Sequence, residues 1–297
     1  MILLLLLIVI TIFIGLILYF SRQVIYPQVL THQHVRKLEL EKELYDPDDF
    51  ENYASEDVRI QSYFGYTLKG KVYLQEKTDK FVLLCHGITS NYEDMYKYCK
   101  IFLDRGYSVM IYDHRNHGLS DRNFTSLGYY EKKDAKKCID YLMQRYNEPQ
   151  VGVFGVSMGA ATAMQLSTID DRVKFCIEDC GYSDTERLLK HRALEDHNAL
   201  IALLLKPSDI YTKLFYKFSY KDASVIHNIN KITCPILFIH GDQDDYVPYY
   251  MVHELHEVYK GDKELLIIEG ARHANAINTN KLKYVTGVHD FLETYGI

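Results

Sequence analysis

The chain of 297 residues is long enough for one large domain, and 47% hydrophobic with 25% charged residues is ordinary globular chemistry. A formal net charge of −6 argues against a nucleic-acid partner, because such a partner calls for a basic surface. The six cysteines form no C-x-x-C pair, and several fall in apolar runs. We therefore expect buried free thiols rather than disulfides or a metal site.

The first residues form a segment of their own, because residues 2–20 are an apolar run without any charge. As a helix rising about 1.5 Å per residue, this run is long enough to cross the hydrocarbon core of a bilayer. A secretory signal peptide would show a basic segment, a shorter apolar core and a small-residue cleavage site, and the sequence has none of these. The sequence predicts a retained transmembrane anchor over residues 1–22.

The charges that follow the anchor indicate its orientation. Arg22, Arg36 and Lys37 come after the apolar run, and no basic side chain precedes it. The positive-inside rule then places the large domain on the cytoplasmic side of a single-pass anchor. Residues 23–50 are interpreted as a stalk and linker, with a short charged helix expected over 34–44.

Residues 51–297 show short apolar runs that alternate with longer amphipathic ones, as in one α/β domain. Strands are expected at 58–64, 67–74, 81–85, 107–112, 151–156, 173–177, 236–239 and 265–268. Helices are expected at 91–104, 126–146, 158–167, 251–259 and 280–295. The first two strands form an antiparallel pair in this prediction. The alternation of the others predicts a mainly parallel, doubly wound sheet with helices on both faces.

The rhythm breaks once, over residues 183–231, where helical pieces replace the strand-helix alternation. An insertion of that size beside the carboxyl ends of the strands predicts a helical cap over the site, because sites are built at those ends.

A serine lies at the turn between the expected strand 151–156 and the following helix. Gly155-Val156-Ser157-Met158-Gly159 fits the pattern G-x-S-x-G in the strand-turn-helix context that gives this pattern its meaning. A serine in so sharp a turn leaves no room for side chains at the flanking positions, which explains the glycines. The pattern predicts Ser157 as a nucleophile.

A serine nucleophile needs two backbone N–H donors for the oxyanion, a general base and an orienting carboxylate. The N–H groups of Met158 and Ile88 are the expected donors, since Ile88 follows the strand 81–85 in His86-Gly87-Ile88. We expect His86 itself to shape this loop by a hydrogen bond. In chain order the acid comes before the histidine, which points to His273 and to the carboxylates of the segment 240–248.

On these motifs the sequence resembles the α/β-hydrolase superfamily from about residue 58 to 295, and the run 86–91 resembles a bacterial membrane-anchored branch. The family pattern H-G-x-x-D-x-x-V-P, laid on residues 240–248, implies Asp244 as the acid, with Asp242 or Asp245 as the alternatives. The resemblance also implies His273 as the base. Residues 113–120 resemble the family's D-x-R-G-x-G-x-S loop, with Asn116 where glycine is commoner.

Other motifs are interpreted as structural. His114 and His117 are expected in a solvated loop, and the run H-E-L-H-E at 253–257 lacks the spacing of a zinc site. No G-x-G-x-x-G loop follows a strand, so neither a cofactor nor a metal is predicted. An aromatic cluster in the cap could line an acyl pocket or form the cap's own core; it comprises Tyr211, Phe215, Tyr216, Phe218 and Tyr220.

The sequence thus predicts a membrane-anchored serine hydrolase that cleaves carboxylic esters or related acyl bonds through an acyl-serine intermediate. Lipid-derived substrates that arrive from the bilayer are a hypothesis based on the anchor. Three alternatives stay open: a peptidase or amidase with the same three residues, a membrane-bound acyltransferase, and a non-catalytic binding module of the same fold.

Overall fold

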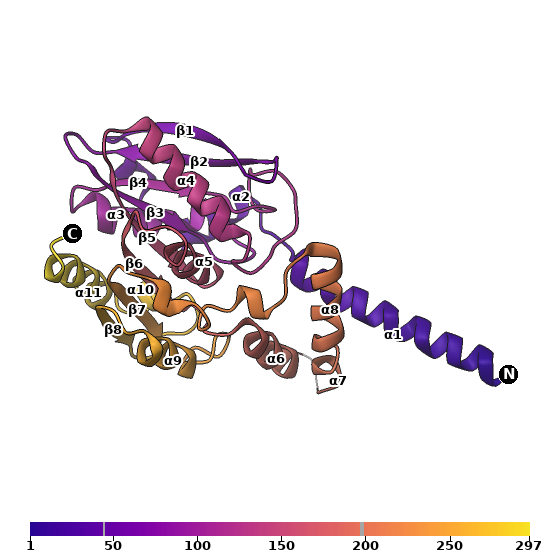
Figure 1. Ribbon diagram of the computed structural model, residues 1–297. Coiled ribbons are helices and arrows are strands. Elements are labelled where there is room, and N and C mark those ends of the chain that lie inside the picture. The colour runs from indigo at the N-terminus through magenta and orange to yellow at the C-terminus, as the bar shows by residue number, and fades with distance from the viewer. Residues whose placement is uncertain (44, 197–198) are drawn as a thin grey trace.

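The computed structural model describes residues 1–43, 45–196 and 199–297. An eight-stranded sheet in the order β1-β2-β4-β3-β5-β6-β7-β8 forms the centre of the domain (Figure 1). The strands are β1 (Ala54–Gln61), β2 (Thr67–Leu74), β3 (Lys80–Cys85), β4 (Ser108–Tyr112), β5 (Gln150–Val156), β6 (Val173–Asp179), β7 (Ile236–Gly241) and β8 (Lys263–Ile268). Among the described strands, β2 pairs antiparallel with β1 and with β4, and the other pairings are parallel. The predicted mainly parallel sheet is confirmed.

Helices cover both faces of the sheet, because the central strands are apolar on both sides and must be buried on both. One hydrophobic cluster includes side chains of α4 (Glu131–Arg145), α5 (Met158–Ser167) and α9 (Tyr250–Val258). The other includes side chains of α3 (Tyr96–Leu103), α10 (Ala276–Thr279) and α11 (Lys281–Thr294). This is the doubly wound arrangement that the strand-helix alternation predicts.

One helix is shorter than expected. The helix predicted over 126–146 begins only at Glu131, because the Glu131 carboxylate accepts hydrogen bonds from the backbone N–H groups of Ser126 and Gly128. These contacts hold the preceding residues in a turn.

The predicted cap lies between β6 and β7. It consists of α6 (Thr185–Asp196), α7 (Ala199–Ala202) and α8 (Leu205–Tyr216), followed by the 3-10 turns η3 (Lys221–Ala223) and η4 (Ile229–Lys231). Figure 1 shows these helices at the same end of the molecule as the first helix of the chain.

The first helix, α1 (Ile2–Ile25), projects away from the domain (Figure 1). It is long and apolar enough to cross a bilayer. The helix continues beyond Arg22, and its last turns enter the domain, where Ser21 and Ile25 are completely buried. The apolar helix therefore joins the domain without a flexible joint at residue 22.

The segment after α1 is packed against the domain as well. The helix expected over 34–44 is α2 (His32–Glu41), and residue 44 lies outside the described residues. Glu39 of α2 is buried and binds the Lys97 Nζ at 2.9 Å, while Asp94 in the 3-10 turn η2 (Tyr92–Met95) binds the same Nζ at 2.6 Å. A further 3-10 turn, η1 (Pro47–Phe50), leads into β1.

Candidate active site

Ser157 occupies a strained turn between β5 and α5. Its backbone has φ 57° and ψ −117°, a region that residues with a Cβ rarely adopt. A Cβ on Gly155 would lie 2.1 Å from the carbonyl oxygen of Gly159, and a Cβ on Gly159 would lie 2.0 Å from that of Cys85. Both distances are far inside van der Waals contact, so the turn that presents Ser157 requires both glycines.

The structure brings together the three residues that the sequence analysis singled out. The Ser157 Oγ lies 2.9 Å from His273 Nε2, and His273 Nδ1 lies 2.7 Å from Asp244 Oδ2. An ionised carboxylate only accepts hydrogen bonds, so Nδ1–H donates to Asp244 and Nε2 is left to accept the serine proton. The three residues follow β5, β7 and β8, whose carboxyl ends lie at one edge of the sheet.

The Asp244 carboxylate is held from several sides. Its Oδ1 accepts the backbone N–H groups of Tyr246 and Val247, each at 2.9 Å. Its Oδ2 also lies 3.2 Å from His240 Nε2. Burial would raise the pKa of Asp244, but hydrogen bonds from His240 and His273 outweigh it and lower the pKa below its usual range. Asp244 is therefore an anion at neutral pH.

The alternative acid Asp242 is engaged elsewhere. Its Oδ1 accepts the backbone N–H of Gly270 at 2.7 Å, which ties the turn after β7 to the turn after β8. This contact gives Asp242 a turn-shaping role, while Asp244 is the carboxylate at His273.

The predicted oxyanion donors lie beside the serine. Ile88 and Met158 line the same cavity as Ser157, and a Cβ on Gly87 would come within 3.6 Å of the serine Cβ. The N–H of Met158 follows the nucleophile at the start of α5, where the helix dipole also favours negative charge. The loop and the helix start thus meet at the place where an oxyanion would form.

His86 shapes the oxyanion loop. Its Nε2 accepts the backbone N–H of His114 at 2.9 Å, so its Nδ1–H donates to the carbonyl of Gly87 at 2.7 Å. Burial lowers the pKa of His86 well below its usual value, which keeps the ring neutral and able to accept. These two bonds connect the loop after β3 to the loop after β4.

The expectation that His114 and His117 lie in a solvated loop is wrong. Both rings are completely buried beside His86, and burial lowers the pKa of His114 to about 3. The loop folds inward because the Asp113 carboxylate accepts the backbone N–H of Leu119 at 2.7 Å. Asn116 has φ 65°, a left-handed conformation that asparagine tolerates better than most residues and that explains its place in a glycine position.

The cavity at Ser157 has a volume of about 210 Å³. One wall is the serine turn and the oxyanion loop. The opposite wall comes from two helices, and its residues are Phe20, Gln23 and Val24 of α1, with Leu188, Leu189, Arg192, Ala193 and Asp196 of α6. Pro27, Thr89, Leu127, Tyr182 and Tyr246 complete the lining. Apart from a few polar groups, the lining is apolar, as in most small-molecule sites.

Sequence reasoning missed the contribution of α1 to this wall. A signal was present, since the apolar pattern continues past Arg22 to Val24 and Ile25, as in a helix that enters a core. The aromatic cluster of the cap does not line the cavity. Its member Phe218 is buried against Phe124 and Tyr129, which lie outside the cap, whereas Phe215 is exposed.

The cap touches the histidine through one tyrosine. The Tyr246 ring stacks on His273 with centroids 4.7 Å apart, and the Arg192 guanidinium of α6 lies 4.3 Å from the Tyr246 centroid on the same ring. Arg192 also pairs with Asp196. The position of the cap is thereby coupled to the orientation of the imidazole.

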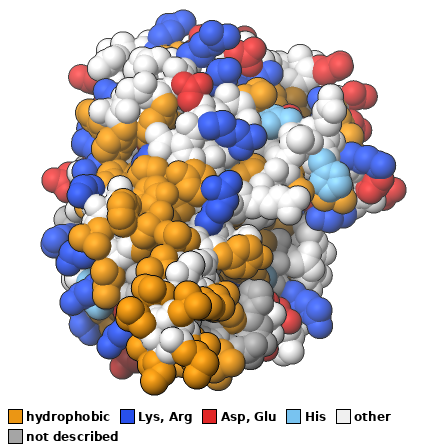
Figure 2. All heavy atoms as spheres, turned by 90° about the vertical axis from the view of Figure 1, so that its right-hand side faces the viewer, with side chains coloured by type: hydrophobic (Ala, Val, Ile, Leu, Met, Phe, Trp, Pro, Cys, Tyr) orange, Lys and Arg blue, Asp and Glu red, His pale blue; other side chains and the backbone are white. Residues whose placement is uncertain are grey.

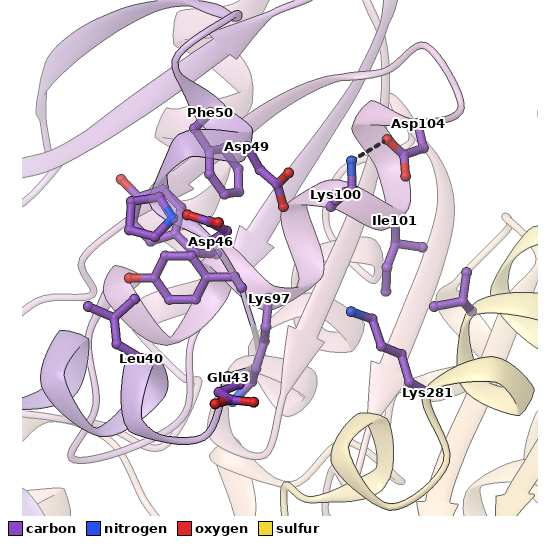
Figure 3. A pocket seen from close by; sticks show the side chains of 14 residues that line it. Leu40, Glu43, Asp46, Asp49, Phe50, Lys97, Lys100, Ile101, Asp104 and Lys281 are labelled. Carbon is purple, nitrogen blue, oxygen red and sulfur yellow. Dashed lines mark hydrogen bonds and ion pairs between the residues drawn. The ribbon is translucent and has the colours of Figure 1, made fainter.

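A larger cavity of about 570 Å³ lies elsewhere, between α2, η1, α3 and α11 (Figure 3). Figure 3 shows acidic side chains such as Asp46 and Asp49 on one side and Lys97 and Lys281 on another. Its lining within the described residues contains no serine, cysteine or histidine, so it offers no serine or cysteine nucleophile with a histidine base. The smaller cavity is the candidate active site.

A sheet of this order, with a serine at the turn after β5 and a helical cap, is the α/β-hydrolase fold. Comparison with known proteins agrees. A family described as serine aminopeptidase, S33, matches residues 76–176. The uncharacterized protein YqkD of Bacillus subtilis is 33% identical over 277 residues, which cover 92% of this chain and 91% of that protein. The chain belongs to the α/β-hydrolase superfamily.

Two similar proteins have activities in their names. The Pyrococcus furiosus esterase Pf2001 superposes with a TM-score of 0.68 at 25% identity, covering 84% of this chain and 94% of that chain. The thiohydrolase aneE of Aspergillus aculeatus is 28% identical over 137 residues, 44% of this chain and 43% of that protein. Together with the family match, they mark this protein as a hydrolase.

Proposed function

We propose that the protein is a membrane-anchored serine hydrolase that cleaves carboxylic esters or related acyl bonds. The observation that carries this proposal is the hydrogen-bonded triad of Ser157, His273 and Asp244, whose serine lines a largely apolar cavity. Esters and thioesters are both acyl compounds, so the esterase and the thiohydrolase among the similar proteins support the same reaction class.

The geometry suits the two steps of acyl transfer. Ser157 Oγ attacks the carbonyl carbon while His273 Nε2 takes the serine proton, and the N–H groups of Ile88 and Met158 stabilise the oxyanion. His273 then returns this proton to the leaving alkoxide, which departs as an alcohol. Water attacks the acyl-serine with His273 again as base, and the carboxylic acid and free serine result. Asp244 orients the ring and stabilises the imidazolium throughout.

The membrane anchor is the second part of the proposal. A signal sequence is removed from the mature protein, but here the last turns of α1 contribute Phe20 and Val24 to the cavity and bury Ser21 and Ile25. Cleavage near residue 21 would remove part of the pocket wall. This packing supports a retained single-pass anchor, and the basic residues after it favour a cytoplasmic domain.

A peptidase is the second candidate, because the matching family is described as serine aminopeptidase. An aminopeptidase must bind a positively charged α-amino group. Among the described residues of the cavity lining, the one carboxylate is Asp196, and its pair with Arg192 neutralises it. The apolar lining favours an acyl chain over a peptide amino terminus.

The test is labelling of the full-length protein in detergent with a fluorophosphonate probe. Wild type should be labelled, and Ser157→Ala and His273→Ala should not, with unchanged thermal unfolding as the control for folding. Matched ester, thioester and aminoacyl-amide substrates then rank the bond types. A folded wild type that resists labelling would contradict the proposal and favour a binding module. Added alcohol that diverts the product into a new ester would indicate an acyltransferase.

A further inference from the structure

Helix α8 of the cap buries one leucine, Leu205, but exposes its other aliphatic side chains. Its buried side includes the hydroxyl side chains of Ser208 and Thr212, whereas Ile210, Leu214 and Phe215 are 60%, 60% and 68% exposed. A helix on the surface of a water-soluble protein turns its apolar side chains inward. An outward apolar face of this kind marks a surface that contacts something other than water.

The position of α8 relative to α1 indicates what that surface contacts. Ser21 follows the apolar run 2–20 directly, and its hydroxyl lies 2.8 Å from the Ser208 Oγ in a buried hydrogen bond. Directly after the last residue of α1, the Tyr26 ring contacts the Tyr216 ring with centroids 6.3 Å apart. Since residues 2–20 span the hydrocarbon, α8 lies at the level where the bilayer surface must be.

Charge on the same face fits a bilayer surface. Lys206, Lys213 and Lys217 are exposed on or next to α8, and Leu203, 70% exposed, extends the apolar face before it. Figure 2, which views the molecule from this end with α1 directed toward the viewer, shows a large hydrophobic area that includes exposed side chains of α1, with lysines and arginines around it. Apolar side chains that enter the headgroup boundary, accompanied by lysines, are the features of a helix that lies on an anionic membrane.

We propose that the exposed face of α8, together with Leu203, docks on the surface of an anionic lipid bilayer and lets a membrane-resident acyl ester reach Ser157 between α1 and α6. This inference rests on the proposed function, since it assigns the substrate class to the same site. The cavity of about 210 Å³ is below the roughly 300–1,000 Å³ of pockets that enclose a drug-sized ligand. It holds the acyl carbonyl and the first part of a chain.

The remainder of a long chain has an apolar route. Phe20 and Val24 line the cavity from α1, and the same helix continues into the exposed apolar run 2–18. A chain that lies along this helix stays in an apolar environment from the bilayer to the serine. Transfer through water, which is unfavourable for every CH₂ group, is avoided.

The test compares two substrates in one preparation of full-length protein in vesicles that contain anionic phosphatidylglycerol. One is a fluorogenic long-chain ester embedded in the vesicle, and the other is the water-soluble ester p-nitrophenyl butyrate. Leu214→Asp and, separately, Leu203→Asp should lower the ratio of the vesicle rate to the soluble rate about tenfold, the loss that one buried leucine side chain produces. Leu282→Asp is the matched control, because Leu282 is 79% exposed on α11 and its change should leave the ratio at the wild-type value.

A second experiment tests the role of the lysines on α8. In vesicles of phosphatidylcholine alone, the wild-type ratio should fall, and Lys206→Glu with Lys213→Glu should remove the difference between the two lipids. An unchanged ratio in Leu214→Asp and Leu203→Asp, or an equal fall in Leu282→Asp, would overturn the docking proposal. Failure of wild type to hydrolyse even the soluble ester would instead contradict the proposed function.

Discussion

The two walls of the Ser157 cavity are built by different means. The wall of the serine turn and the oxyanion loop is fixed by strand ends and buried hydrogen bonds, such as those of His86 and Asp244. The opposite wall is formed by α1 and α6, which are held mainly by side chains. Ser21 of α1 bonds Ser208 of α8, and Arg187 of α6 forms an ion pair with Glu254 of α9. We call the first the chemical wall, because it holds the reacting groups, and the second the helical wall. We expect the helical wall to determine which substrates reach Ser157.

The largest expected effect comes from the chemical wall. Asp244→Asn should lower kcat about 10⁴-fold, because an amide no longer selects the imidazole tautomer that accepts the serine proton. Since the pKa of Asp244 is lowered in the folded protein, this carboxylate should stay ionised well into the acidic range, so its protonation should not limit the activity of wild type there. Asp242→Asn is the control, because its hydrogen bond goes to Gly270. Steady-state kinetics decide, and equal losses in both variants would remove the special role of Asp244.

A smaller but still large effect is expected from the glycine behind the serine. Gly159→Ala places a Cβ 2.0 Å from the carbonyl oxygen of Cys85, and overpacking against backbone should cost about 3 kcal/mol of unfolding free energy. Gly15→Ala serves as control, since a Cβ there meets nothing within 4 Å. Denaturant unfolding in detergent measures both. A Gly159→Ala protein as stable as wild type would show that the turn adapts.

The helical wall should respond in selectivity rather than in chemistry. Val24→Trp fills part of the cavity from α1, and we expect about tenfold lower kcat/KM for long acyl esters with little change for acetate esters. Tyr19→Trp on the exposed side of the same helix is the control. Equal losses for all chain lengths would mean that α1 supports the catalytic residues and does not form a substrate wall.

The smallest effect concerns the segment between α1 and the domain. His32 Nε2 lies 2.8 Å from Asp113 and Nδ1 lies 3.4 Å from Glu93. Burial lowers the pKa of His32, but the two carboxylates outweigh it and raise the pKa to about 9. The stability that protonated His32 gains from these two carboxylates is therefore fully present below about pH 6.5 and is lost as the pH rises through 9.

His32→Asn should accordingly lower Tm at pH 6 by roughly 2–4 °C, the change that about 1 kcal/mol produces after solvent screening. The difference from wild type should close by pH 10. His34→Asn, a change two residues further along the same helix, should cause no such pH-dependent difference in Tm. A Tm difference that is constant from pH 6 to pH 10 would rule out the charged pair.

The sequence predicted most of the chemical wall, because its information is local. The turn at Ser157 is recognisable from a strand, two glycines and a helix within a short stretch. The acid is less certain from the sequence, since spacing alone does not separate Asp244 from Asp242 and Asp245. Only the resemblance to the family pattern points to Asp244. The structure separates them by the hydrogen bonds that each carboxylate makes.

The helical wall was not predictable in the same way. The contact of Phe20 with the cavity of Ser157 joins residues far apart in the chain, which periodicity cannot show. The helical pieces of the cap were expected, but the usual rule turns apolar side chains inward, and α8 leaves Ile210 and Leu214 exposed. The prediction that His114 and His117 lie in a solvated loop failed for a related reason. Polar residues suggest a surface loop unless a side chain such as the Asp113 carboxylate folds the loop inward.

The continuous helix from the anchor into the cavity has a kinetic consequence. A hydrolase on a long flexible tether can reach molecules in solution or on a neighbouring vesicle, but α1 leaves Ser157 no such reach. If the proposed anchoring holds the entrance at one bilayer, the protein should act only on molecules dissolved in that same leaflet. Its rate should then follow the mole fraction of substrate in the membrane, and dilution of that leaflet with inert lipid should slow it even when the total amount of substrate is constant.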